Sequence, residues 1–163
     1  MEPLLEKEYK GLRLVVDYDQ SPESPREYDR FGTMVCFHKS YKLGDEHEFV
    51  DMEYLKEYLA KNPDAIYLPL YLLDHSGLRM STQRFDGNAW DSMHVGYIYA
   101  TKEEIIKEFG KYDTSSIEDT YNRLRSEIAA YDDYLSGNCL AYTIYDNGDF
   151  ADGVGNYLGK TAE

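Results

Sequence analysis

The sequence predicts an α+β fold: a single domain in which about three helices pack on one face of an antiparallel sheet. Three observations support this class. The chain has 163 residues, the size of one domain, and its 42% apolar and 29% charged residues are ordinary for a globular protein. Short apolar runs separated by tight-turn signals are typical of antiparallel strands. Three other segments have helical periodicity and end signals, which places helices beside that sheet.

Apolar and alternating runs predict the strands. Ile66–Leu73 is almost continuously apolar, so we expect a strand buried on both faces, with an edge or a bulge at Pro69. His94–Ala100 alternates in polarity. The expected strands are Leu12–Asp17, Thr33–His38, Ile66–Leu73, Leu78–Phe85, His94–Ala100 and Leu140–Ile144, followed by a bulged, glycine-rich strand over 153–159.

Turn residues stand between several of these runs. Asp74–Gly77 (DHSG) reads as a tight turn, and Asp86-Gly87-Asn88 is another turn signal. Asn147-Gly148 favours a type I′ hairpin.

The helices have start and stop signals of their own. Asp51 can cap a helix over Met52–Lys61, which Asn62-Pro63 would end. A capping box formed by Thr101 and Glu104 predicts a second helix, ending at Gly110. The longest helix is expected over Ile117–Leu135, where apolar residues recur at steps of three and four. We see no linker or repeat, so residues 1–163 form one domain, with frayed ends at 1–11 and 159–163.

The composition limits the possible partners. A net charge of −14 repels nucleic-acid backbones, so direct nucleic-acid binding through a basic patch is not expected. An acidic chain suits a basic protein partner, and 17 tyrosines provide contact area for interfaces. No secretory signal or membrane span is recognisable, and Cys36 and Cys139 have no disulfide-framework spacing, so we expect the cytosol.

Four polar residues are candidates for catalysis. Asp74, His75, Asp91 and His94 could supply a base and an orienting carboxylate for a small hydrolase-like enzyme. However, tight turns favour the same residue types, and no GxSxG elbow is present. The sequence leaves the enzyme hypothesis open and favours the absence of catalysis. No metal-ligand spacing is present, so we expect neither a metal nor a cofactor.

Acidic residues gather in two segments. Seven acids stand against two lysines over residues 43–64, and seven stand against one lysine over residues 127–163. Carboxylates held on a rigid frame can imitate phosphates and occupy a basic groove. The predicted partner-binding residues are Asp45, Glu46, Glu48, Glu53, Glu57, Asp132, Asp133, Asp146, Asp149 and Asp152.

Four stretches resemble a widespread family of small proteins encoded on bacterial phages, plasmids and integrative elements. They are GTMVCFHKSYKLGD (32–45), LPLYLLDHSG (68–77), WDSMHVGYIYATKEEI (90–105) and YDDYLSGNCLAYTIYD (131–146). The resemblance implies a context of mobile elements, whose small acidic proteins include anti-CRISPR and antirestriction inhibitors, some of them DNA mimics. Together with the charge, it favours a non-catalytic inhibitor of a host defence protein over the small hydrolase. A homodimer is a further possibility if tyrosine-rich faces form an apolar patch.

Overall fold

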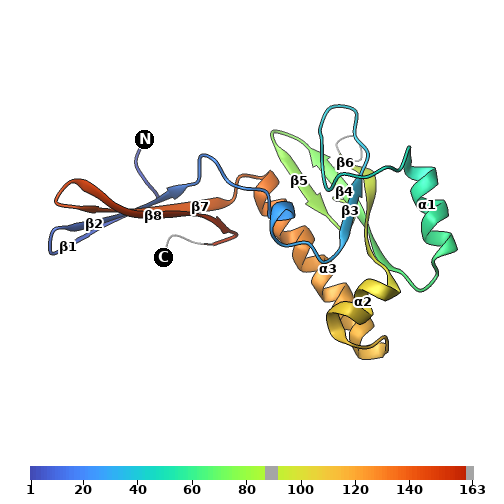
Figure 1. The fold of residues 1–163 in the computed structure, drawn as a ribbon. Helices are drawn as coiled ribbons and strands as arrows, with labels where there is room; N and C mark the ends of the chain where they lie inside the picture. Colours follow the sequence, from blue (N-terminus) through green and yellow to red (C-terminus); the bar gives the residue numbers. More distant parts are fainter. Residues whose placement is uncertain (87–91, 161–163) are drawn as a thin grey trace.

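The computed structural model describes residues 1–86 and 92–160 (Figure 1). Within them, two four-stranded antiparallel sheets and three α-helices confirm the α+β class. The first sheet, with order β3-β6-β4-β5, carries the helices and forms the body; the second, with order β1-β2-β7-β8, forms an arm. The helices are α1 (Met52–Lys61), α2 (Lys102–Phe109) and α3 (Thr114–Leu135), and a short 3₁₀ turn, η1, spans Pro25–Glu27. The strands are β1 (Leu5–Tyr9), β2 (Leu12–Tyr18), β3 (Thr33–Cys36), β4 (Ile66–Asp74), β5 (Leu78–Ser81), β6 (Ser92–Ala100), β7 (Cys139–Asp146) and β8 (Asp149–Leu158).

Helix α3 covers one face of the body sheet. Its stripe contributes Leu124 and Ile128 to the main core, where they meet Leu70 and Leu72 of β4. Helix α2 adds Ile105 to the same core. These side chains are almost completely shielded from water, so burial of this face is the main stabilising contribution in the body.

Helix α1 lies on the opposite face, so the expectation that all helices share one face is corrected here. Leu55 and Leu59 pack with Val35 and Tyr99 in a second, smaller core. Tyr99 alternates with Ile98 and Ala100, which point into the main core. Helices therefore pack on both sides of the body sheet, but β4 is not buried on both faces as predicted: Leu70 and Leu72 are buried towards α3, whereas Tyr67 on the other face is 46% exposed.

The arm extends away from the body, and no helix covers either of its faces (Figure 1). The sequence predicts one sheet, whereas β1, β2, β7 and β8 pair only with one another. Leu5–Tyr9, expected to be frayed, forms β1 along the whole of Leu12–Val16. Periodicity marks strands but does not say which strands pair, because pairing depends on where η1 and α3 deliver the chain.

Several of the turns and helix caps predicted from neighbouring residues are present in the structure. Asn147 and Gly148 have φ values of 50° and 91°, which confirms the left-handed hairpin turn. Both capping-box hydrogen bonds between Thr101 and Glu104 are present, and Gly110 is a left-handed C-cap. Helix α3 begins earlier than predicted, at Thr114, because Asp113 caps it and bonds with Ser116.

Strand β4 explains how a proline is accommodated. Strand β5 pairs only with Tyr71–Asp74, so Pro69 has a neighbouring strand on the β6 side alone. The register shifts between Leu70 and Tyr71, next to the proline. Strand β5 ends at Ser81, before the predicted Phe85. The predicted turn at Asp86-Gly87-Asn88 lies mostly outside the described residues.

A buried ion network joins η1 to α3 and to the loop after β3. The Arg26 guanidinium donates to Asp45 at 2.9 and 2.8 Å, to Glu127 at 2.9 Å and to the Gly32 carbonyl at 2.7 Å. Glu127 also accepts hydrogen bonds from the backbone N–H groups of Phe31 and Gly32. The three charged side chains are 1–7% exposed, so each depends on the others for its polar partners.

Candidate functional site

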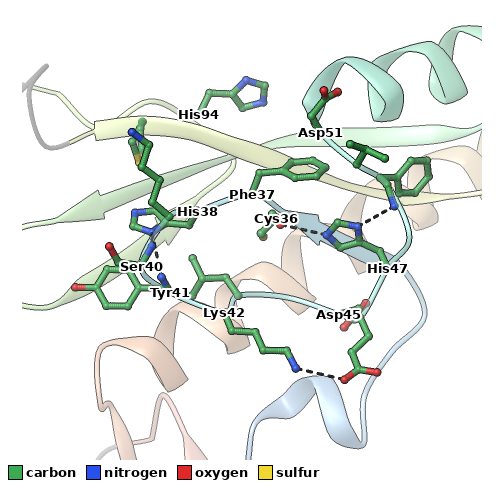
Figure 2. Close-up of a pocket in the computed structure, with 16 residues that line it drawn as sticks. Cys36, Phe37, His38, Ser40, Tyr41, Lys42, Asp45, His47, Asp51 and His94 are labelled. Atoms are coloured by element: carbon green, nitrogen blue, oxygen red, sulfur yellow. Dashed lines mark hydrogen bonds and ion pairs between the residues drawn. The ribbon is translucent and has the colours of Figure 1, made fainter.

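An open groove of about 1250 Å³ lies beside the loop that joins β3 to α1 (Figure 2). That loop, residues 37–51, supplies most of its wall, and Cys36 of β3 with Met93 and His94 of β6 supplies the rest. Three of the four histidines of the chain line the groove: His38, His47 and His94. Figure 2 shows these imidazoles well apart from one another.

His47 holds the loop together. Its Nε2 lies 3.3 Å from the Cys36 carbonyl, and its Nδ1 accepts from the Phe49 amide at 3.2 Å. A carbonyl only accepts and an amide only donates, so these contacts assign the proton to Nε2 of a neutral imidazole. The ring also packs edge-on against Phe37 at 5.1 Å. His47 is therefore a structural residue of the groove wall.

His38 also has a structural role, at the start of the same loop. Its Nδ1 accepts from the amides of Ser40 and Tyr41 at 3.0 and 3.2 Å, which folds the segment that follows β3. Behind it, burial raises the pKa of the Cys36 thiol to about 12. A thiol with that pKa is protonated at neutral pH, so Cys36 is not an activated nucleophile.

His94 lies between two tyrosines on the α1 side of β6. Its ring centroid is 5.3 Å from Tyr71 and 4.9 Å from Tyr97, and its Nε2 donates to the Gly96 carbonyl at 3.0 Å. Burial lowers the pKa of His94, and the hydrogen bond to Gly96 opposes that effect in part. Nearby Lys56 and Arg84 also disfavour the imidazolium.

Of the catalytic candidates that the structure describes, Asp74 and His94 are not brought together. Asp74 follows Leu72 by two residues, which places it on the α3 side of the sheet, whereas His94 pairs with Tyr71 on the α1 side. His75 lies in the exposed turn after β4, where its amide donates to Gly77 at 3.0 Å. Asp91 lies outside the described residues. In residues 1–86 and 92–160, no three His, Cys, Asp or Glu side chains are arranged to hold a metal ion.

Three predicted partner-binding acids have internal roles. Asp45 is buried against Arg26 and accepts a further bond from the Met34 amide at 2.8 Å. Asp132 of α3 forms a two-pronged contact with Arg79, at 2.9 Å for each bond, and accepts from the Met80 amide. Asp133, also on the α3 C-terminal turn, accepts from Asn138 at 3.0 Å. These carboxylates fix the loop after β3, the edge strand β5 and the start of β7.

The remaining predicted acids of the first cluster are Glu46, in the groove loop, and Glu48, Glu53 and Glu57, on or next to α1. Glu46, Glu53 and Glu57 have side chains that are 89%, 82% and 62% exposed. Glu48 and Glu57 border a shallow hollow of about 430 Å³, which also contains Phe49, Val50, Tyr54, Tyr58 and Lys61. We call these seven residues, together with the exposed Glu53 of the same helix, the α1 patch.

The α1 patch exposes apolar side chains between its carboxylates. Val50 is 77% and Tyr54 is 56% exposed, unusually high values for residues of these types. The sequence analysis did not select them, although Tyr54 lies off the helix stripe formed by Met52, Leu55 and Leu59. An aromatic residue off the buried stripe of a helix is expected to face solvent, and this position is the sequence signal that could have identified Tyr54.

The second acidic cluster is divided by the fold. Asp146, Asp149 and Asp152 remain exposed on the β7–β8 hairpin, at the far end of the molecule from α1 (Figure 1). Asp152 accepts from the Tyr142 hydroxyl at 3.3 Å. The two acidic groups cannot form one continuous surface, because the body sheet separates them.

Comparison with known proteins places no outside constraint on this site: no family model, curated protein or solved structure matches the chain. In the described part of the chain, no helix has the length and apolar character needed to cross a membrane.

Proposed function

We propose that this chain is a non-catalytic accessory protein of a phage or mobile element that binds a host defence protein through that protein's basic, nucleic-acid-binding surface. The binding takes place in the host cytosol. The observation that carries the proposal is the α1 patch, where exposed Val50 and Tyr54 stand among carboxylates.

This arrangement suits a protein interface. Aromatic side chains surrounded by polar groups are the usual anchors of binding energy, and Tyr54 has that position. The carboxylates of Glu53 and Glu57 pair only with exposed lysines of the same helix, at 3.4 and 3.6 Å. Such surface pairs contribute about 0–1 kcal/mol, so a lysine or arginine of a partner can replace them at little cost.

The arm acids have a complementary effect at longer range. Asp146, Asp149 and Asp152 add negative charge at the opposite end of the molecule, beyond the reach of one contact surface. Charge of this kind increases the rate of encounter with a basic protein more than it increases the affinity of the final complex. The α1 patch is therefore the contact, and the arm acids contribute to steering or to imitation of a nucleic-acid ligand.

A hydrolase is the weaker alternative. Asp74 and His94 lie on opposite sides of the body sheet, and the groove histidines donate to or accept from backbone groups. No observation in the described residues favours a catalytic role over this structural one.

The test is a competition experiment. Host proteins retained on a heparin column are passed over the immobilised chain, and retained proteins are eluted with duplex DNA. We expect a DNA-binding protein to be captured and to be displaced by DNA. At 0.5 M salt, where exposed charge is screened beyond about 4 Å, its affinity should fall by a factor of about ten or more.

Two double variants make the test specific to the patch. Glu53→Lys with Glu57→Lys reverses charge on α1, whereas Glu118→Lys with Asp119→Lys makes the same change in net charge on exposed positions of α3. We expect the first pair to abolish capture and the second to weaken it only slightly. Equal losses in both variants, or capture that DNA does not compete with, would contradict the proposal.

A further inference from the structure

One face of the arm is mostly apolar, and most of it is not covered by another layer. The cross-strand register places alternate residues of its four strands on the same side. The apolar members of this face are Leu5, Tyr9, Leu12, Leu14, Val16, Tyr18, Leu140, Tyr142, Ile144, Val154 and Tyr157. We call this surface the arm face.

The apolar residues of the arm face are contiguous across the strands. One row runs Leu5, Val16, Tyr142 and Val154, apolar in all four strands. The next row towards the body contains Tyr18, Leu140 and Tyr157. The rings of Tyr142 and Tyr157 lie 6.0 Å apart, which agrees with the register.

The opposite side of the arm has a different character. There Arg13 pairs with Glu6 at 3.1 Å and lies over the Tyr145 ring at 4.5 Å. Glu8 and Asp17 share that side with the apolar Val15, Tyr145 and Phe150, so the two sides differ in the number of apolar residues and each carries charged ones. The more apolar side of a sheet is normally covered by another layer.

The described chain covers only the body end of this face, where Leu140 is 4% exposed. Neither core cluster includes a residue of the arm. On the arm face, Leu12 and Val154 are 45% exposed and Tyr9 is 69% exposed. Seven residues of β2 and four strands give a face of roughly 450 Å², charged residues included, which is within the usual size of the largest patch on a monomer.

We propose that a second copy of this chain covers the arm face, so that two arms stack as the sheets of a β-sandwich. Stacked sheets lie about 10 Å apart with their strands nearly aligned. A two-fold axis in the plane of the face and across the strands sends the two bodies to opposite ends. This avoids overlap of the bodies, which are thicker than the arms (Figure 1).

The arm face is self-complementary in that arrangement. At the arm tip, Asp146 and Asp149 occupy one row; at the body end, Tyr18 and Tyr157 occupy another. The two-fold axis lays the tip row of each copy over the body-end row of the other. The hydroxyls of Tyr18 and Tyr157 in one copy then lie near Asp146 and Asp149 of the other, where a hydroxyl can donate to a carboxylate. The other charged members of the face, Lys7 and Asp152, lie on its edge strands β1 and β8, where they can remain in water.

The size of the face sets the expected affinity. Two faces of roughly 450 Å² bury less than a standard interface, so the dimer dissociates with a constant on the order of micromolar or weaker. Higher salt should strengthen it, because screening reduces repulsion between two acidic chains while apolar burial persists. That dependence is opposite to the one expected for the basic partner, so the two proposals can fail separately.

The experiment is sedimentation velocity on the full chain from about 1 to 500 µM, a range around the affinity class expected for a small interface. We compare Val154→Lys on the arm face with Phe150→Lys on the other side of the same strand. Both side chains are exposed in the monomer, at 45% and 68%, so neither change removes core packing, and both add one positive charge. We expect Val154→Lys to weaken the dimer about tenfold or more and Phe150→Lys to leave it intact.

A second pair tests the centre of the face. Val16→Asp and Val15→Asp alter neighbouring, half-buried residues of β2 that point to opposite sides. Val16→Asp should give a monomer and Val15→Asp should leave the dimer intact. Both variants should keep the circular dichroism spectrum of the wild type, which shows that they fold. A wild-type chain that stays monomeric at 500 µM, or equal loss in the members of either pair, overturns the proposal. A monomer whose binding to a basic host protein is lost in Val154→Lys would assign the face to that partner instead.

Discussion

Replacing Arg26 with methionine should destabilise the protein more than any other single change in its ion network. Arg26 is the only cation among the three buried members, facing Asp45 and Glu127. Methionine fills similar volume but leaves two buried carboxylates without a counter-charge. Burial alone would lower the pKa of Arg26, but Asp45 and Glu127 outweigh burial and raise it.

The magnitude follows from the partners that remain. Removing one side of a buried pair costs about 3–5 kcal/mol, because the other charge stays buried and unpaired. In a domain of this size, about 4 kcal/mol corresponds to a fall of roughly 8–16 °C in Tm. Glu127→Gln should cost less, about 1–3 kcal/mol, since Arg26 and Asp45 then form a neutral pair and glutamine keeps one acceptor for Phe31 and Gly32.

The pH dependence provides an independent check. Burial raises the pKa of Glu127, while Arg26 lowers it, so removing Arg26 raises it further. A carboxyl group with a raised folded pKa contributes stability below its unfolded pKa, about 4.3, and that stability is lost as the pH rises through the folded pKa. The deficit of Arg26→Met should therefore be smaller at pH 5 than at pH 7.5.

Urea unfolding followed by circular dichroism measures these free energies. The wild type, Arg26→Met and Glu127→Gln are compared at both pH values, with equal m-values as the condition for comparing them. Two results would refute the reasoning: a cost below about 1 kcal/mol for Arg26→Met, a value typical of an ordinary exposed pair, or a larger cost for Glu127→Gln than for Arg26→Met.

Two further predictions concern β6. Gly96→Ala should lower the free energy of unfolding by about 1–3 kcal/mol or more, because its Cβ would lie 1.8 Å from the Val35 carbonyl oxygen of β3; thermal unfolding within 1 °C of wild type would contradict that close approach. His94 should titrate below the usual histidine pKa of about 6.5 in an NMR titration of its imidazole. Since its folded pKa lies below the unfolded value, stability should fall as the pH drops through about 6.5, and His94→Gln should flatten that slope; a midpoint above 6.5 would refute the assignment.

Several elements were predictable from the sequence because their signals are local. The capping box of Thr101 and Glu104, the Asn147-Gly148 turn and the stripe of α3 each depend on residues within a few positions of one another. Such interactions are encoded in spacing. The α+β class followed from the same patterns and is confirmed.

The candidate site was less accessible to sequence reasoning. Asp45 and Asp132 are acidic residues like Glu53, and no local pattern distinguishes a carboxylate that meets a distant arginine from one that faces water. Arg26 lies 101 positions from Glu127, yet their side chains are 2.9 Å apart. Only the folded chain shows which acids are used internally.

The sequence by itself determined the fold class, the net charge of −14 and most of the element positions, because composition and periodicity are properties of the chain alone. The tertiary structure decided that the strands divide into a body and an arm, that α1 lies on the face opposite α3, and that Asp74 and His94 do not meet. It also decided that the arm has one mostly apolar side, most of which is not covered by another layer. The physical reason is that strand pairing and burial join residues far apart in the chain, and an alternating pattern gives a strand two faces without saying what lies against either one.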